Sequence, residues 1–421
     1  MEENKKIKVL VLSDHPLSPS GVGTQTKNMV EACLKTEKFQ FVCFGGAIKH
    51  MDYTPKTVDP YGTDWVIYPV DGYGNHEMIR SALRSHKPDI LWFMTDPRFF
   101  GWLWEIENEI RSLVPMVYYH VWDNYPYPNF NKVFYDSTDC IAAISKVTHD
   151  IVNTVSPEVE SFHVPHAVDN KIFKPLDKEE TKKYILSAMP QLEDKVVFFW
   201  NNRNARRKQS GTLIFWFKEF LDKVGHDKAA LVMHTNPKDG HGQDLAAIIN
   251  ELGIVNGEVT FSTQAVDPQT LALLYNFSDC TINISDAEGF GLSTLESLSC
   301  GTPIIVNMTG GLQEQVTDGE NWFGVGIEPS SKAIIGSQEV PYIYEDRLNK
   351  DDFINALMKI YELSDSERQE IGLLGKKYVE ENYSFEAYTE RWPKLLEQIH
   401  LEHGSWDTRK KFKPWHLLEV K

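Results

Sequence analysis

Short apolar runs alternate with helix-length amphipathic stretches along almost the whole chain. In the first half these runs lack the regular polar positions of a half-exposed strand, a pattern typical of strands buried on both faces. Amphipathic segments at 24–34, 77–85 and 146–155 separate them. The alternation predicts βαβ units and a parallel sheet. The expected strands lie at 7–12, 39–44, 89–94, 116–121, 140–144 and 162–164.

The pattern restarts after a polar segment at 170–194, which is rich in Lys, Glu and Asp. Further strands are expected at 196–200, 229–234, 259–261, 280–284 and 303–306, and helices at 351–363, 365–381 and 385–402. A chain of 421 residues is long enough for two domains. We therefore predict an α/β protein with two doubly wound, Rossmann-like domains facing each other across a cleft. The expected divisions are a first domain at 1–168, a linker at 169–194, a second domain at 195–384, and a C-terminal helix and tail at 385–421 that packs back on the first domain or frays.

Composition narrows the class of protein. With 42% hydrophobic and 24% charged residues, the chain resembles a soluble globular protein. Its net charge of −17 argues against a protein that binds a polyanion through its overall electrostatic field. Five scattered cysteines without CxxC or metal-ligand spacing indicate reduced thiols. The apolar run before Asp14 is too short for a signal peptide or membrane span. We expect a cytoplasmic protein with no metal and no cofactor.

The first candidate loop, at 14–24, follows the first strand and leads into a helix. Gly21 and Gly23 permit a close approach of the backbone, and the helix start offers free N–H groups to an anion. A plain βα turn has the same residues, and a G-x-G pattern alone does not decide between the two.

A second candidate follows the strand at 116–121. His120 leaves that strand, and Trp122, Asp123 and Tyr125 come directly after it. Polar residues beside aromatic ones form either a binding lip or the capped edge of a core.

A basic segment follows the strand at 196–200 and contains three arginines and a lysine between Arg203 and Lys208. Arginine binds phosphate in a bidentate manner and lysine binds it as a point charge, so a diphosphate suits this loop. A solvated loop that neutralises nearby carboxylates is the alternative. Its position at the carboxyl end of a strand favours a binding role.

The segment at 285–301 reads as a glycine-rich turn followed by a helix from Leu292. Glu296 lies one turn after Leu292 and borders the inward face of that helix. A carboxylate there needs a partner, and the two hydroxyls of a ribose suit it. Glu288 precedes the helix beside the N–H groups of Phe290 and Gly291, where a negative charge is also simply stabilising. Two glutamates around E-G-F-G favour a binding site.

The spacing of Glu288 and Glu296 resembles the E-x7-E signature of retaining glycosyltransferases with the GT-B fold, the large family called glycosyl transferases group 1 or family four. Four further segments resemble that family in the same order. S-G-V-G at 20–23 resembles its N-terminal glycine loop, and V-P-H-A-V-D…F-K-P at 164–175 resembles its interdomain segment. Arg203…Lys208 keeps its R-x4-K spacing, and G-G-L…E…V at 310–316 resembles G-G-x-x-E-x-V. The resemblance covers about residues 7–390.

The resemblance implies roles for individual residues. Glu296 would hold the donor ribose, and Glu288 would touch the donor sugar. Arg203 and Lys208 would neutralise the leaving diphosphate in place of a metal ion. The implied catalytic residues are His120, Glu288, Arg203 and Lys208, and the implied donor-binding residues are Gly21, Gly23, Arg203, Lys208, Glu288, Phe290, Gly291, Leu292 and Glu296.

The same resemblance assigns acceptor binding to the domain at 1–168, with Trp122, Asp123 and Tyr125 as candidates, and nucleotide-sugar binding to the domain at 195–384. It implies that a hexose-type sugar moves from a UDP- or GDP-sugar to a hydroxyl acceptor, by family frequency a glycan or polysaccharide precursor. The helix at 24–34 has Lys27 as its one basic residue, which argues against docking on a membrane.

Three departures leave the sugar and the base open. Asn202 replaces a glycine before Arg203, His166-Ala167 replaces Asn-Gly, and residues 234–236 replace a further glycine. A hydroxylated base in DNA is an alternative acceptor, because aromatic residues at 99–104 and 122–130 could stack a flipped base, although the net charge disfavours it. A catalytically idle GT-B scaffold would have lost the Arg203/Lys208 pair. A dinucleotide-dependent dehydrogenase is excluded, since the third glycine of G-x-G-x-x-G is missing.

Overall fold

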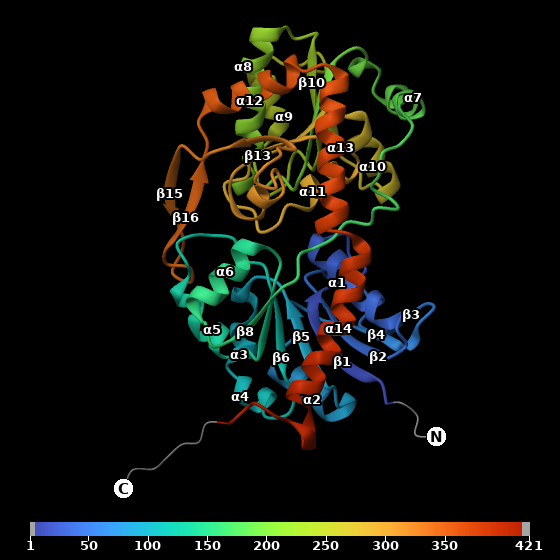
Figure 1. Cartoon of the computed structure of the whole chain (residues 1–421), viewed down its shortest axis with the longest axis vertical. Coiled ribbons are helices and arrows are strands. Elements are labelled where there is room, and N and C mark those ends of the chain that lie inside the picture. Colours follow the sequence, from blue (N-terminus) through green and yellow to red (C-terminus); the bar gives the residue numbers. More distant parts are fainter. Residues whose placement is uncertain (1–4, 415–421) are drawn as a thin grey trace.

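The computed structural model describes residues 5–414 and divides them between two lobes, each built on a sheet (Figure 1). The N-terminal lobe has eight strands in the order β3-β4-β2-β1-β5-β6-β7-β8, all parallel except for the β3–β4 pair. The C-terminal lobe has six parallel strands in the order β11-β10-β9-β12-β13-β14. The α/β class with two doubly wound domains, predicted from the sequence, is confirmed.

The strands of the N-terminal lobe are β1 (Ile7–Asp14), β2 (Phe39–Gly46), β3 (Lys56–Val58), β4 (Gly62–Pro69), β5 (Ile90–Met94), β6 (Met116–His120), β7 (Cys140–Ala143) and β8 (Glu160–His163). Those of the C-terminal lobe are β9 (Val196–Asn201), β10 (Ala229–His234), β11 (Val259–Ser262), β12 (Cys280–Asn283), β13 (Ile304–Asn307) and β14 (Gly324–Ile327). The central strands β5, β6, β12 and β13 are buried along their whole length, which explains their continuous apolar sequences.

The helices of the first lobe are α1 (Gly21–Leu34), α2 (His76–His86), α3 (Gly101–Trp104), α4 (Glu107–Arg111), α5 (Lys132–Asp136) and α6 (Lys146–Val155). The second lobe has α7 (Lys178–Ala188), α8 (Ser210–Val224), α9 (Leu245–Leu252), α10 (Pro268–Phe277), α11 (Leu292–Ser299), α12 (Lys350–Glu362) and α13 (Asp365–Asn382), and α14 (Phe385–His403) follows. Six short 3-10 helices are η1 (Pro97–Phe100), η2 (Asn129–Asn131), η3 (Pro190–Leu192), η4 (Arg206–Lys208), η5 (Gly310–Glu314) and η6 (Trp406–Thr408). Side chains cap several N-termini, such as Ser20 on α1 and Ser145 on α6, which satisfies N–H groups that lack helical partners.

The strand order reverses next to β1 in one sheet and next to β9 in the other. β1 pairs with β2 and β5, and β9 pairs with β10 and β12. Ligands of such sheets bind beyond the carboxyl ends of the strands at this reversal. The two reversals face each other, because a Cβ added to Gly21 at the start of α1 would lie 3.3 Å from Leu292 at the start of α11. The candidate site therefore lies where the lobes meet.

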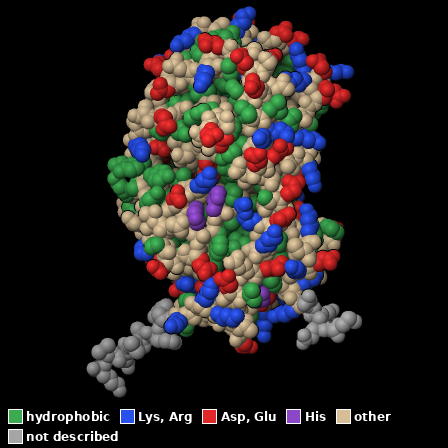
Figure 2. Space-filling view, in the orientation of Figure 1, with side chains coloured by type: hydrophobic (Ala, Val, Ile, Leu, Met, Phe, Trp, Pro, Cys, Tyr) green, Lys and Arg blue, Asp and Glu red, His purple; other side chains and the backbone are tan. Residues whose placement is uncertain are grey.

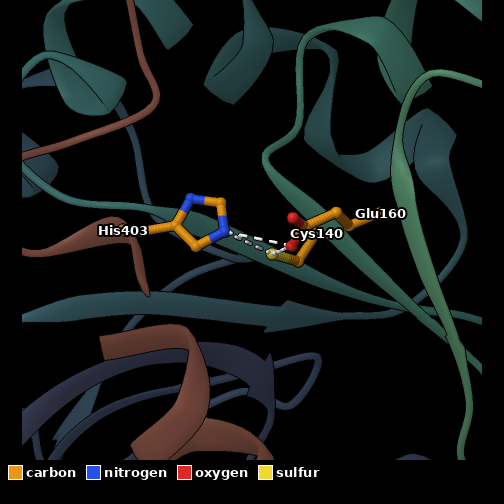
Figure 3. A group of neighbouring side chains, drawn as sticks. All are labelled: Cys140, Glu160 and His403. Carbon is orange, nitrogen blue, oxygen red and sulfur yellow. Dashed lines mark hydrogen bonds and ion pairs between the residues drawn. The ribbon is translucent and has the colours of Figure 1, made fainter. Parts of the chain in front are cut away.

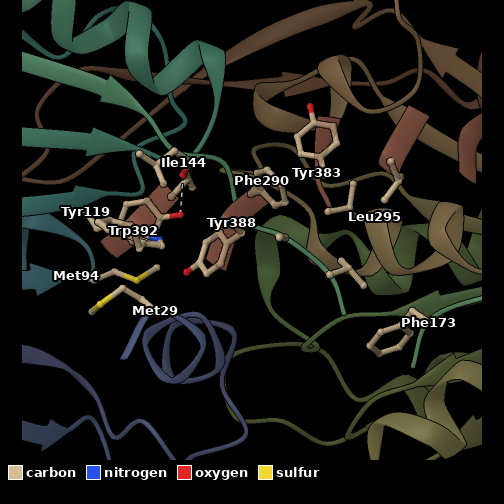
Figure 4. Packing of buried hydrophobic residues seen from close by; sticks show 14 of the residues in the cluster. Met29, Met94, Tyr119, Ile144, Phe173, Phe290, Leu295, Tyr383, Tyr388 and Trp392 are labelled. Carbon is tan, nitrogen blue, oxygen red and sulfur yellow. Dashed lines mark hydrogen bonds between the residues drawn. The ribbon is translucent and has the colours of Figure 1, made fainter. Parts of the chain in front are cut away.

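The last long helix, α14, returns to the N-terminal lobe. It packs on α1, and the Tyr388 hydroxyl donates to the carbonyl of Gln25 at 3.0 Å. In Figure 4, Tyr388 and Trp392 extend from this helix among buried residues of both lobes, which form one continuous cluster. Val168 and Ser384, at the two places where the chain crosses between lobes, form an isolated parallel bridge.

A two-stranded hairpin was not predicted from the sequence. It consists of β15 (Ser331–Ile335) and β16 (Ile343–Arg347), belongs to the second lobe and reaches the first (Figure 1). The side chain of Asn124 donates to the carbonyl of Tyr344 at 2.9 Å, and Val340 and Ile343 join the core of the first lobe. Its polar, mostly part-exposed strands carry no buried apolar run, so the pattern could not reveal it. Strands β3 and β4 were also missed, because β3 has three residues and β4 alternates buried with part-exposed positions.

The segment after α14 contacts the first lobe between residues 405 and 412. Ser405 donates to Asp89 at 2.7 Å, and the indole of Trp406 donates to the carbonyl of Pro88 at 2.8 Å. The rest of the tail expected at 385–421 lies outside the described residues. Within residues 5–414, no helix is both long enough and apolar enough to cross a membrane.

Candidate functional site

Lys208 and Glu288 form the centre of the candidate site. Lys208 ends η4, which follows β9, and Glu288 lies in the turn between β12 and α11. Both are buried, and the Lys208 ammonium donates to Glu288 Oε2. Burial lowers the pKa of Lys208 to about 8, although Glu288 opposes the change. Burial raises the pKa of Glu288, but the charges of Lys208 and Arg207 outweigh it and hold that pKa below its usual range.

The two arginines Arg203 and Arg207 lie at different distances from this cluster. The Arg203 guanidinium lies outside this cluster, with 61% of its side chain exposed, and its Nε donates to Asp239 Oδ2 at 2.7 Å. Arg207 instead lies 3.8 Å from Glu288 Oε2 and donates to the carbonyl of Ala287. Of the predicted pair, only Lys208 contacts Glu288, and the structure adds Arg207 as the second nearby cation.

Glu296 accepts the last hydrogen bond in a chain of three side chains of the same lobe. The Tyr275 hydroxyl donates to Glu296 Oε2 at 2.7 Å and accepts a hydrogen bond from the Asn201 side chain at 2.8 Å. Burial raises the pKa of Glu296 to about 7, even though the Tyr275 hydrogen bond opposes this. Tyr275 and Asn201 were not identified from the sequence, because an apolar helix and a strand end carry no motif.

Two glycines hold the turn before α11 in place. The N–H of Gly311 donates to the carbonyl of Glu288 at 2.9 Å, and a Cβ on Gly310 would collide with that same oxygen. Gly291 has φ = 92°, a conformation that favours glycine, and it begins α11 without a side-chain cap. Phe290 is buried against His166 and Tyr383. The first turn of α11 therefore keeps N–H groups that can donate hydrogen bonds to a ligand.

The two glycines at the start of α1 allow close packing at two different places. Gly21 faces Leu292, whereas a Cβ on Gly23 would lie 2.5 Å from Ser18 Oγ, within its own loop. Gly23 thus serves the packing of this loop. Ser20 Oγ accepts from the N–H of Gly23 at 3.0 Å and donates to Asp14 Oδ2 at 2.6 Å.

His120 is fully buried at the end of β6. Its Nε2 lies 2.7 Å from the Tyr135 hydroxyl, and its ring packs against Tyr118. Burial lowers the pKa of His120 to about 3, so the imidazole is neutral at physiological pH. Within residues 5–414 its Nδ1 has no hydrogen-bond partner.

Of the three candidates for acceptor binding, Asp123 is the one that faces the charged cluster. A Cβ on Gly289 would lie 3.8 Å from Asp123 Oδ2 and 2.9 Å from the carbonyl of Val121. Burial raises the pKa of Asp123 to about 6, although the charges of Arg207 and Lys208 oppose this. Trp122 packs into the core of the first lobe, and the Tyr125 carbonyl accepts from the N–H of Tyr344 in the hairpin.

The hairpin β15–β16 adds an ion-pair network that sequence reasoning missed. Arg206 pairs with the buried Glu345, and Arg347 pairs with both Glu345 at 2.8 Å and Asp286 at 2.5 Å. These contacts hold η4, which carries Lys208, against the turn that carries Glu288. The network joins segments far apart in the chain, so no local spacing could reveal it.

Comparisons with solved structures identify the fold. The fold resembles that of sucrose-phosphate synthase from Thermosynechococcus elongatus, with a TM-score of 0.73 at 16% identity over 94% of this chain and 100% of that one. It also resembles Anabaena HepE in complex with UDP-glucose, with a TM-score of 0.69 at 15% identity over 93% of this chain and 100% of that one. The chain has the GT-B fold.

A family match covers the second lobe. Residues 171–372 match the model of the glycosyl transferases group 1 family. Similar curated proteins include N-acetyl-alpha-D-glucosaminyl L-malate synthase from Bacillus anthracis, 22% identical over 57% of this chain and 60% of that protein. D-inositol 3-phosphate glycosyltransferase from Acidothermus cellulolyticus is 30% identical over 40% of this chain and 38% of that protein. The matches thus span less than two thirds of these relatives.

Proposed function

We propose that the protein transfers a hexose-type sugar from a nucleoside diphosphate sugar to a hydroxyl acceptor, with retention of configuration at the sugar. The observation that carries this proposal is the cluster of Lys208, Arg207 and Glu288 at the uncapped start of α11, opposite Asp123 of the other lobe. Two cations and free N–H groups at one point suit a diphosphate.

In the proposed reaction, Lys208 and Arg207 bind the diphosphate together with the first-turn N–H groups of α11. The bond between the sugar C1 and the diphosphate oxygen breaks, and the leaving group takes the electron pair. The two cations stabilise the charge that develops on it, which is the main catalytic effect. The acceptor hydroxyl bonds to C1 on the same face, and its proton passes to the leaving diphosphate.

Lys208 has to exchange partners when the donor binds. In the structure it donates to Glu288, so a phosphate oxygen would replace a carboxylate oxygen as its acceptor. Glu288 would then accept hydrogen bonds from the hydroxyls of the donor sugar. Asp123, with its partly desolvated carboxylate, would bind the acceptor hydroxyl from the opposite side.

The acceptor is proposed to be a glycan or polysaccharide precursor. On the face shown in Figure 2, acidic and basic side chains are interspersed, and the net charge of the chain is −17. This distribution supports a small or weakly charged acceptor over a nucleic acid, which requires a basic surface.

A screen of donors tests the proposed function. Thermal unfolding of the purified protein would be measured with UDP-, GDP- and ADP-sugars and with the free nucleoside diphosphates. The correct donor stabilises the folded state by mass action, by about 2.7 kcal/mol at about 100 times its Kd. We expect a UDP- or GDP-sugar to raise Tm and to release nucleoside diphosphate slowly in the presence of water. If no nucleotide sugar raises Tm or is consumed, the proposal is wrong.

We predict that donor binding depends on the ionisation of Glu296. Its pKa in the free protein is about 7, and the ionised carboxylate accepts both ribose hydroxyls. Affinity should therefore fall as the pH drops through this value, by about tenfold per pH unit well below it. Calorimetry between about pH 5.5 and about pH 8 measures the effect. Glu296→Gln should bind weakly and without this inflection, and an identical pH profile in the variant would exclude the role.

A further inference from the structure

Three side chains of the N-terminal lobe form a second cluster, remote from the candidate site. Cys140 begins β7, Glu160 begins β8, and His403 ends α14. Figure 3 shows the three pointing toward one another. Cys140 and Glu160 lie at the amino ends of their strands, whereas the candidate site lies at the carboxyl ends of the strands.

The three potential ligand atoms are mutually in contact. His403 Nε2 lies 3.1 Å from Glu160 Oε2 and 3.4 Å from Cys140 Sγ, and Sγ lies 3.6 Å from the same Oε2. A tetrahedral zinc ion with its usual bond lengths would hold sulfur, nitrogen and oxygen ligands about 3.3–3.6 Å apart. The triangle therefore matches one face of such a site, and we propose that Cys140, Glu160 and His403 bind a divalent zinc-like cation.

Hydrogen bonding by itself accounts poorly for this triangle. The triangle has three edges, but the thiol and the imidazole Nε2 offer at most one hydrogen each, so one edge is left without a hydrogen bond. A shared cation satisfies all three atoms at once, with the thiol as thiolate. His403 is almost fully buried, whereas 39% of the Glu160 side chain is exposed, so the solvent side offers a path for the ion and a position for a water as fourth ligand.

The charges around the cluster favour an added cation. Glu160 and Glu402 share one ammonium, that of Lys411, at 2.8 and 2.7 Å. The neighbouring Asp139 is already matched by Arg409 at 2.7 Å and Arg111 at 3.2 Å. Two carboxylates at the cluster therefore share a single lysine, and a divalent ion that displaces the thiol proton adds positive charge beside them.

The kind of ion follows from the ligands. A sulfur, a nitrogen and a carboxylate oxygen are the donor set of zinc in proteins, whereas magnesium and calcium take oxygen ligands. The sequence predicts no metal site, because its cysteines show no metal-ligand spacing. These ligands lie 20 and 243 residues apart, so spacing could not disclose them.

The proposed ion would fasten the end of α14 to the sheet of the first lobe. Other contacts also hold this region, including Ser405 with Asp89 and Arg409 with Asp139. The protein should therefore fold without the ion and gain thermal stability when it binds. This inference does not depend on the proposed sugar transfer.

A titration of the metal-stripped full chain with Co²⁺, followed by competition with Zn²⁺, tests the proposal. We expect one equivalent of Co²⁺ to produce a thiolate-to-cobalt charge-transfer band and the visible bands of a tetrahedral ion, and Zn²⁺ to abolish both and raise Tm. Cys140→Ser should remove the charge-transfer band, and His403→Gln should weaken binding at least about 100-fold.

Two matched controls separate this site from adventitious binding. Cys43→Ser changes another buried thiol of the same sheet, and His400→Gln changes another histidine of α14. Both should bind Co²⁺ like the wild type. The absence of a charge-transfer band in the folded wild type, or its persistence in Cys140→Ser, would overturn the proposal in favour of a hydrogen-bonded triad. If a variant fails to fold, the wild-type spectrum still decides.

Discussion

Replacing Lys208 by alanine is expected to reduce the rate of sugar transfer by about 10²–10³-fold. Lys208 is the buried cation closest to Glu288, and in the proposed reaction its charge stabilises the leaving diphosphate. The loss should appear mainly in kcat, since the cation contributes most when negative charge develops in the transition state. Steady-state kinetics with the donor found by the screen would measure it.

The same substitution also leaves Glu288 buried with only Arg207 nearby, at 3.8 Å. Removing one partner of a buried ion pair costs about 3–5 kcal/mol, and Arg207 should reduce this cost. The double variant Lys208→Ala, Glu288→Gln removes the uncompensated charge and should recover stability without recovering activity.

A lysine on a neighbouring helix provides the control. Lys218 in α8 is partly exposed and pairs with Asp222 at 2.7 Å, so Lys218→Ala should leave kcat unchanged and alter stability by less than about 1 kcal/mol. Wild-type kcat in folded Lys208→Ala would contradict the role given to this residue.

The largest loss of stability is expected for Trp392→Ala. The Trp392 side chain is 0% exposed and packs on the sheet of the first lobe, with its ring centroid 4.9 Å from that of Tyr119 and 5.8 Å from that of Trp92. A large-to-small change at such a site costs about 3–5 kcal/mol, because it removes buried apolar surface and leaves a cavity. Urea denaturation, followed by tryptophan fluorescence and circular dichroism, would measure the cost.

Two variants on the same helix calibrate this prediction. Leu401 is 73% exposed, so Leu401→Ala should change stability by no more than about 0.5 kcal/mol. Trp392→Phe keeps most of the apolar contact and should lose less than the alanine variant. If Trp392→Ala were as stable as Leu401→Ala, Trp392 would not anchor α14 on the first lobe as the structure indicates.

The predicted core strands correspond closely to those observed, because a strand buried on both faces has a continuous apolar sequence. The runs at 116–121 and 280–284 became β6 (Met116–His120) and β12 (Cys280–Asn283). β4 and the hairpin β15–β16 were not predicted, because exposed positions interrupt the apolar sequence of their strands. Burial on one face only, or on neither, leaves a weaker signal.

The candidate site could be predicted in part. Glu288 and Glu296 flank one turn, so their spacing describes a local structure, and Lys208 follows a neighbouring strand of the same sheet. That Arg207 lies beside Glu288 in the structure, and Arg203 does not, could not be read from the sequence. It depends on the short helix η4 and on Asp239, which binds Arg203 from a distant loop.

By itself, the sequence determined the α/β class, the two doubly wound sheets and the glycine-rich turn that begins α11, because these follow from the periodicity and chemistry of neighbouring residues. The tertiary structure decided which residues meet across the chain: Asp123 opposite Gly289, Glu345 between Arg206 and Arg347, and His403 beside Cys140. Contacts of this kind depend on how whole sheets and helices pack against each other. The pattern of neighbouring residues in the sequence does not predict that packing.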